Sequence, residues 1–440
     1  MTARSYKGAL PVRWRRVLDV ANGSQRRCGV AWTYTNRAAA ARASLVVLVL
    51  LTTGLSSAYG SPRSRALTRQ GYSEAYQLNF PESASIFAEA RRADPLDPAP
   101  ARALAAITWM EILFAQGVAT FEAFQGDASG DSVQRPSVDA ALTTRFLALA
   151  GEAVKLAEQH VAAAPTDTDA LYQLGASTGL LALYRATVEG RTWAAFVEGR
   201  RAVRTMTRVR QQDNQHREAA LILGMYRYAA STLSWPKRML ASAAGMPGDR
   251  AGGIALLEAA AAPTAETATD AALLLVIVYN REGRHADAMR HLRQLRERHP
   301  ANRLLTLNAA ATALATCDAA AAVATITAGL ATHPKFDQPR VLGERAMWYY
   351  IRGAARAALA DRGAADDLRE ALASNPRDWI RARTHLEFAT LALQSGDERQ
   401  ARLELEVAER YGRRGGDSVA LGAAEQLGRE QPSLRGCRAD

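Results

Sequence analysis

The segment NREGRHADAMRHLRQLRERHP, residues 280–300, holds three histidines and six arginines, side chains that bind metals, transfer protons or bind phosphates. Two histidines that ligate one metal from a helix are expected at positions i and i+4. His285 and His291 are six residues apart, so this spacing does not favour a metal site. We predict neither a metal nor a cofactor here.

Other patterns that carry chemistry are missing from the sequence. It contains no His-Glu-x-x-His motif and no Gly-x-x-x-x-Gly-Lys phosphate loop. The stretch GDASGD, residues 126–131, is acidic but lacks the alternating ligands and the closing glutamate of a calcium loop. The remaining histidines occur singly, which is typical of surface or satisfied residues. We therefore predict a protein that is not an enzyme.

The apolar residues of the segment 280–300 indicate a structural role for it. Ala288, Leu292 and Leu295 recur at intervals of four and three, which predicts one buried stripe on a helix. The charged residues lie at other angles, and we expect them to form a solvated outer face. These residues are Arg284, His291, Arg293, Arg296 and Arg298.

The same segment belongs to a repeat. Pro300 and Pro334 are thirty-four residues apart, and apolar positions before Pro300 fit two helices, at 266–281 and 284–298, joined at Gly283. Units of similar pattern include GERAMWYYIRGAARAALADRGAADDLREALASNP and RARTHLEFATLALQSGDERQARLELEVAERYG. In these residues the chain resembles the tetratricopeptide repeat (TPR) family, over about residues 66–412.

This resemblance implies an all-α fold, an α-α superhelix of about seven helix pairs with a concave inner wall. The first helix of each pair lines that wall in the family. The family's inward positions, carried onto this sequence, predict binding residues for a peptide or a partner protein. They are Tyr172, Asn280, Arg281, Tyr349 and Arg356.

A second resemblance covers residues 220–300. GMYRYAASTLSWPKRML and GDRAGGIALLEAAA are similar in layout to the eukaryotic inclusion-body clearance family of TPR proteins. The shared elements are a Gly/Tyr helix, a connector with proline, a Gly-Asp-Arg turn and a Leu-rich helix. The resemblance implies an interaction protein with no known chemistry.

Two stretches interrupt the repeats, and we interpret both as long loops. Residues 117–138 are rich in Gly, Ser and Asp, and residues 233–253 separate two apolar helices. Trp235, Met239 and Leu240 in the second stretch suggest an alternative function, in which an apolar lid closes a pocket for a small molecule or a lipid.

The charge and the composition restrict the partners. The net charge is +11, but the first 60 residues hold nine of the 55 Lys/Arg and one of the 44 acidic residues. The rest of the chain is nearly neutral and lacks the uncompensated cations that nucleic acids need. Aromatic residues make up 7%, and alanine dominates the apolar share, which favours packed helices over sheets.

The basic excess precedes SLVVLVLLTTGLSSAYG, residues 44–60. Basic residues, a short apolar run and small residues in this order predict a signal peptide over about 37–60 and export to the bacterial periplasm or cell envelope. The alternative is an uncleaved anchor in the inner membrane. Cys317 and Cys437 remain after cleavage and are candidates for one disulfide.

We thus expect three parts: an N-terminal extension with the signal peptide or anchor at 1–60, a repeat domain at 61–415 and a flexible tail at 416–440. The predicted function is a scaffold or adaptor that binds a protein or peptide in the concave groove. No nucleic acid is expected, and the membrane is contacted only through the N-terminal segment. The sequence leaves the oligomeric state open.

Overall fold

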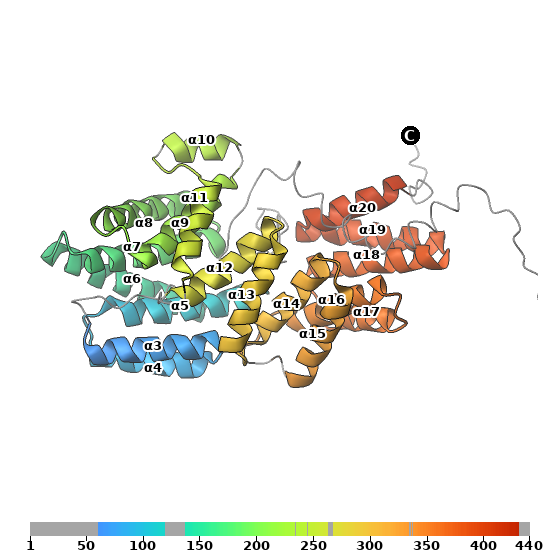
Figure 1. The fold of residues 1–440 in the computed structure, drawn as a ribbon, viewed down its shortest axis with the longest axis horizontal. Helices are drawn as coiled ribbons and strands as arrows, with labels where there is room; N and C mark the ends of the chain where they lie inside the picture. Colours follow the sequence, from blue (N-terminus) through green and yellow to red (C-terminus); the bar gives the residue numbers. More distant parts are fainter. Residues whose placement is uncertain are drawn as a thin grey trace, which may run out of the picture.

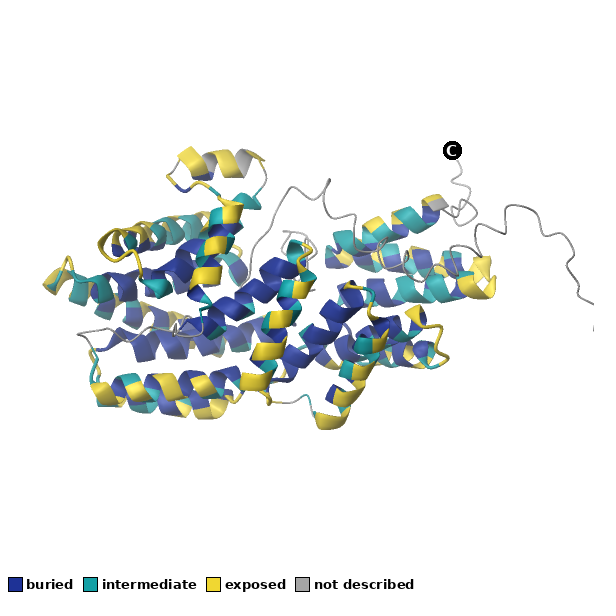
Figure 2. Ribbon diagram, in the orientation of Figure 1, coloured by how far each residue is buried: buried dark blue, intermediate teal, exposed yellow. Residues whose placement is uncertain are grey.

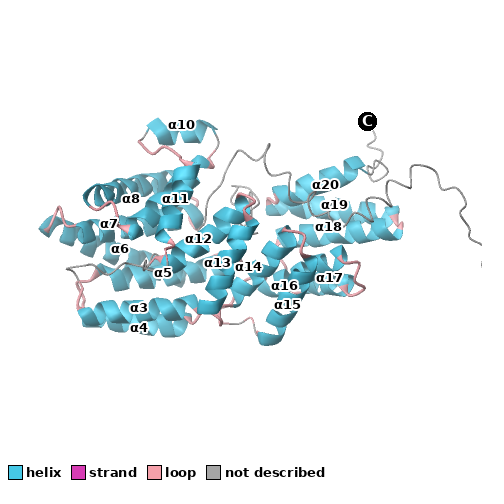
Figure 3. Ribbon diagram, viewed as in Figure 1, coloured by secondary structure: helices cyan, strands magenta, loops and turns pink. Residues whose placement is uncertain are grey.

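The computed structural model describes residues 60–118, 137–233, 235–243, 245–262, 267–333, 336 and 338–430. Within these ranges every regular element is an α-helix, and Figure 3 shows no strand in them. The prediction of an all-α fold is confirmed. The predicted leader at 37–60 and the predicted loop at 117–138 lie almost entirely outside the described residues, and so does Cys437.

The helices follow one another along a curved stack (Figure 1). The first nine are α3 (Pro62–Tyr76), α4 (Phe80–Ala93), α5 (Pro98–Ala115), α6 (Ala140–Ala163), α7 (Thr168–Thr187), α8 (Thr192–Gln212), α9 (Arg217–Ser231), α10 (Trp235–Ala243) and α11 (Arg250–Ala260). The others are α12 (Ala268–Arg281), α13 (His285–Arg298), α14 (Arg303–Ala315), α15 (Ala319–Thr332), α16 (Glu344–Ala358), α17 (Ala364–Ala373), α18 (Asp378–Ser395), α19 (Glu398–Gly415) and α20 (Ser418–Glu430).

Consecutive helices pack as pairs, and the chain is a TPR-like helical repeat protein. The pairs are α3–α4, α5–α6, α7–α8, α9–α11, α12–α13, α14–α15, α16–α17 and α18–α19. The described residues thus form eight pairs, one more than the seven or so expected, with α10 inserted between α9 and α11. The predicted helices at 266–281 and 284–298 correspond to α12 and α13.

Short local signals set the ends of the helices. Asp97, Asp167 and Asp397 each precede a helix and accept a hydrogen bond from a backbone N–H of its first turn, which satisfies a donor that the helix leaves free. Pro95 and Pro300 follow two residues after the ends of α4 and α13, where their rings prevent continuation of the helix. The sequence therefore fixes the boundaries locally.

The two helices of a pair differ in burial, as Figure 2 shows. The first helices of some central pairs are buried almost all round: α5 has 16 buried residues of 18, and α14 has 12 of 13. Their partners are amphipathic, and α13 buries only Ala288, Leu292 and Leu295 of its 14 residues, as predicted. A helix that is apolar on every side must be covered on every side.

The early pairs provide that cover by touching later ones. The Tyr76 hydroxyl at the end of α3 donates a 2.7 Å hydrogen bond to Asp270 of α12. The Asn302 amide, which caps α14, donates to the Tyr76 carbonyl at 2.8 Å. The Leu342 N–H donates to the Phe114 carbonyl of α5 at 2.9 Å. One hydrophobic core cluster therefore extends through the pairs, with members from Tyr72 to Ile380.

The predicted flexible tail at 416–440 is wrong for its first part. Residues 418–430 form α20, which packs on α18 and α19. Asp417 precedes it and is buried against Arg383 of α18, at 2.7 Å between Oδ2 and Nε. α20 thus covers the apolar end of the stack, as terminal repeats require. None of the helices within the described ranges is long and apolar enough to cross a membrane.

Candidate functional site

The prediction that Tyr172 binds a partner in a concave groove is wrong. Its side chain is 2% exposed, and its ring lies 5.8 Å from the Arg102 guanidinium carbon and 5.1 Å from the His216 ring. Burial raises the pKa of the Tyr172 phenol, which therefore stays neutral. Tyr172 does occupy an inward position, but the protein itself fills the space in front of it.

Asn280 is also wrong as a partner contact, because it is 4% exposed and fully engaged. Its amide donates to the Val276 carbonyl at 2.9 Å and to the Thr312 hydroxyl at 3.1 Å, and its oxygen lies 2.9 Å from the His285 ring. These bonds join α12 to α13 and α14. The neighbouring Arg281 keeps intermediate exposure at the end of α12.

A buried polar cluster lies at the centre of the stack. Arg102 of α5 is 0% exposed and donates through Nη1 to the Gln173 oxygen of α7. Its Nε and Nη2 atoms have no hydrogen-bond partner within the described part of the chain. Asp97 and Asp270 are buried nearby and partly balance the charge. With no exposed surface, the cluster contributes to holding the pairs together.

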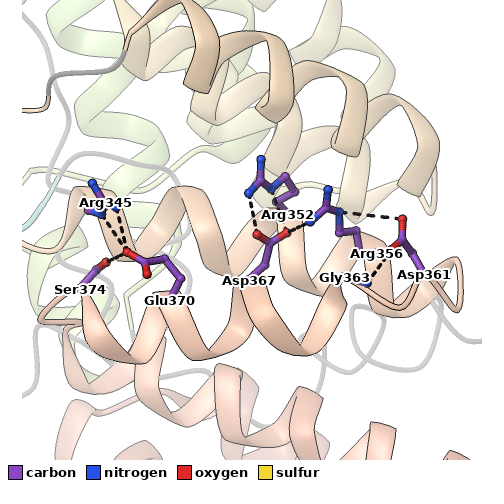
Figure 4. A network of polar contacts seen from close by, with 8 residues as sticks. All are labelled: Arg345, Arg352, Arg356, Asp361, Gly363, Asp367, Glu370 and Ser374. Carbon is purple, nitrogen blue, oxygen red and sulfur yellow. Dashed lines mark hydrogen bonds and ion pairs between the residues drawn. The ribbon is translucent and has the colours of Figure 1, made fainter.

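Arg356 belongs to a network of polar contacts between α16 and α17, shown in Figure 4, and Tyr349 lies near two arginines of that network. Arg352 and Arg356 both contact the Asp367 carboxylate, at 2.6 Å from Nη2 and Nη1. The Tyr349 ring lies between Arg345 and Arg352, whose guanidinium carbons are 5.2 and 5.3 Å from its centroid. Acidic residues of α17 thus neutralise the arginines, which tie the two helices of one pair.

Arg352 and Arg356 contact Asp367 on the side of α16 that faces α17, and partner binding by Tyr349 and Arg356 stays a prediction. A Cβ on Gly353 would lie 2.8 Å from Cδ2 of Leu368, so Gly353 is the small residue that faces the partner helix. One residue rotates a helical position by about 100°. Tyr350 and Ala354, one position after Tyr349 and Gly353, are 5% and 4% exposed.

The described residues show no arrangement typical of catalysis. No group of three His, Cys, Asp or Glu side chains that could hold a metal occurs among them. His385 pairs with Glu404 at 2.6 Å, and no nucleophile is recorded beside this pair. Glu387 of α18 is half-buried, and burial raises its pKa to about 7. A single carboxyl of this kind can hold a proton but defines no reaction.

Four large apolar side chains are exposed to solvent, and their exposure contributes nothing to the stability of the fold. Trp193 and Val197 of α8 are 69% and 50% exposed, and Trp235 and Met239 of α10 are 65% and 53% exposed. We call these four residues the Trp patch. In each helix the two residues are four positions apart and share one face. Exposed aromatic clusters are typical of interfaces.

The Trp patch has two halves, one on α8 and one on α10. A short turn joins α8 to α9, so the two helices are antiparallel. At about 1.5 Å per residue, α9 ends level with roughly residue 198 of α8. The chain then enters α10, which stands off the pairs in Figure 1. α10 contacts the end of α9, whereas Trp193 and Val197 lie on the first turns of α8.

The sequence-based prediction identified part of this feature and gave it a different function. Trp235 and Met239 were expected to form a lid over a pocket, together with Leu240, whose side chain is not described. Because the first two are mostly exposed, they do not close over a cavity, and the structure does not support that alternative. Trp193 and Val197 were missed, although their spacing in TWAAFVEGRR is that of one helix face.

No family model matches the sequence, and no curated protein sequence matches it. Among solved structures the chain is similar to the APC/C hetero-tetramer Cut9-Hcn1, with 14% identity and a TM-score of 0.40 over 79% of this chain and 59% of that longer one. A tetratricopeptide repeat protein from Parabacteroides merdae has 14% identity and a TM-score of 0.31, covering 74% of this chain and 99% of its own.

The human IFIT1 dimer with m7Gppp-AAAA is similar at 12% identity and a TM-score of 0.43, over 85% of this chain and 86% of that one. At these values the likeness carries no information on ligands or partners. The description of the chain as TPR-like follows from the helix pairs themselves.

Proposed function

We propose that the protein is a non-enzymatic interaction scaffold of the bacterial cell envelope and that it binds a partner protein through the Trp patch. The exposure of Trp193 on α8 and of Trp235 on α10 carries this proposal. Exposed tryptophans gain apolar contact area on binding and rank among the strongest anchors of protein interfaces.

The first helices of the central pairs are largely buried, so we place the binding surface on the outside of the stack and not on a concave wall. The first helices α5, α7, α12 and α14 offer little exposed surface to a peptide, because most of their residues are buried. A rigid centre is favourable for an adaptor, since it holds the outer contact residues in fixed positions before the partner arrives.

The contact test uses the full chain expressed in its host. A photo-crosslinking amino acid at Met239 captures the partner, and the yield is compared between the parent and the double variant Trp193→Ala/Trp235→Ala. We expect the yield to fall about tenfold, because each lost tryptophan anchor is worth more than about 1 kcal/mol.

The matched control is Leu359→Ala/Leu403→Ala, two leucines that are each 50% exposed, one directly after α16 and one on α19. This control should keep the parent yield. Equal yields from both double variants would rule out the Trp patch as the partner surface.

The envelope location rests on the basic and apolar segment at 37–60 and is tested separately. Cell fractionation followed by N-terminal sequencing should recover the protein outside the cytoplasm, beginning near residue 60. Recovery in the cytoplasm with the leader intact would contradict export. Recovery in the inner membrane with the leader intact would favour the anchor.

A further inference from the structure

The exposed face of α8 continues beyond the Trp patch as a row of arginines. Arg201, Arg204 and Arg208 follow Val197 at intervals of four, three and four residues, and all three are exposed. Residues with these intervals share one helix face. We call these three residues the arginine track. From Trp193 to Arg208 the face is about 22 Å long at 1.5 Å per residue.

The charge of the arginine track is mostly uncompensated. Arg201 contacts Glu158 at 2.5 Å, and both side chains are more than 40% exposed, so this pair is weak and exchangeable. Arg208 donates to the Pro165 carbonyl at 3.1 Å, which leaves its charge in place. Arg204 contacts no carboxylate within the described residues.

The imbalance is particular to this helix. α8 contains five arginines and one glutamate, Glu198, which already contacts Arg185 at 3.3 Å. The outer helix α19 contains five arginines and four glutamates, so its charges nearly cancel. Arginines at intervals of three and four residues on one exposed face do not stabilise a helix, because like charges at i and i+4 destabilise it slightly.

We infer that the occupant of the Trp patch is an acidic amphipathic segment of the partner protein, which lies along α8. Its apolar residues cover the Trp patch, and its carboxylates follow the arginine track. The guanidinium group forms paired hydrogen bonds with a carboxylate in one plane, so three arginines on one face select such a segment. This inference rests on the proposed function of the Trp patch.

The experiment places a photo-crosslinking amino acid at Val197 in one variant and at Thr207, beside the arginine track, in another. The crosslinked peptides are sequenced from the intact protein in its host. We expect both positions to capture the same segment of one protein, with apolar residues at Val197 and at least two Asp or Glu near Thr207. A lipid adduct, a peptide of this same chain or a segment without acidic residues would overturn the inference.

The captured segment is then synthesised, and its affinity for the full chain is measured by fluorescence anisotropy. Arg204→Glu/Arg208→Glu should weaken binding about tenfold or more, and a peptide with Lys in place of its Asp and Glu should restore it. Arg293→Glu/Arg298→Glu on α13, which also reverses two exposed arginines, should leave the affinity unchanged.

The outcomes separate the two proposals. If the captured segment binds with equal affinity to the charge-reversed variant and the parent, the arginine track does not choose the partner, while the Trp patch remains its contact surface. If Val197 captures no protein at all, the proposed function fails as well.

Discussion

Arg303 of α14 donates two hydrogen bonds to Glu344 of α16, at 2.7 Å from Nε to Oε1 and 2.8 Å from Nη2 to Oε2. Both side chains are buried, and Arg303 also donates to the carbonyls of Gln338 and Pro339. The pair therefore connects two neighbouring repeats and the loop between them. Burial raises the pKa of Glu344, which the Arg303 charge opposes.

Replacing one residue of this ion pair should lower the free energy of unfolding far more than replacing both. We expect Arg303→Met to lower the free energy of unfolding by about 3–5 kcal/mol, because it leaves a buried carboxylate without a counter-charge. The double variant Arg303→Met/Glu344→Leu should recover most of that loss. Urea unfolding followed by circular dichroism measures both, and equal losses in the two variants would show that the charge is not the cause.

The contact between α3 and the later pairs should weaken in acid through His299. Its ring lies 5.2 Å from the Tyr76 ring, and burial, aided by the nearby Arg298, lowers its pKa to about 4. The folded state then binds fewer protons than the unfolded state between about pH 6.5 and 4. Stability contributed by His299 is thus full above pH 6.5 and is lost as the pH falls through this window.

The variant His299→Phe separates this effect from other titrations. Between pH 6.5 and 4 the parent should lose up to about 3 kcal/mol more than the variant. The measurement is urea unfolding at a series of pH values. Parallel stability curves for the two proteins would contradict the role of His299.

The helix α20 should depend on one buried residue. Asp417 accepts from Arg383 and also from the Val419 and Ala420 N–H groups, so it both anchors and caps α20. We expect Asp417→Ala to raise hydrogen exchange across residues 418–430 at least tenfold while α5 and α14 keep their protection. Unchanged exchange in 418–430 would show that apolar packing alone holds α20.

One turn residue offers a stabilising substitution. Ala360 is exposed and adopts a left-handed φ of 55°, which costs a residue with a side chain more than it costs glycine. Ala360→Gly should raise the free energy of unfolding by about 0.5–1 kcal/mol. Gly396→Ala is the control, since its φ is 81° and no atom crowds it, and it should lower stability by a similar amount.

The features that could be predicted from the sequence depend on neighbours within about one repeat. The stripe of Ala288, Leu292 and Leu295, the stop at Pro300 and the turn at Gly283 all follow from local spacing, and the structure has each of them. Side-chain periodicity reports which face of a helix is covered by its own pair. It therefore predicted the pairs and the outer faces well.

The inner wall could not be predicted in the same way. Whether Tyr172 faces solvent depends on how tightly the stack winds, and that is set by contacts such as Tyr76 with Asp270, 194 residues apart. A signal was present, since α5 and α14 are apolar on all sides, which an open groove does not require.

The contacts between the early and the later helix pairs also constrain how this chain can evolve. In an open array each repeat touches only its neighbours, so whole units can be duplicated or deleted. Here, one extra unit between α6 and α12 would move Tyr76 away from Asp270 and Phe114 away from Leu342. The copy number is thereby fixed, and divergence is left to outward insertions such as α10 and to substitutions on exposed faces such as that of α8.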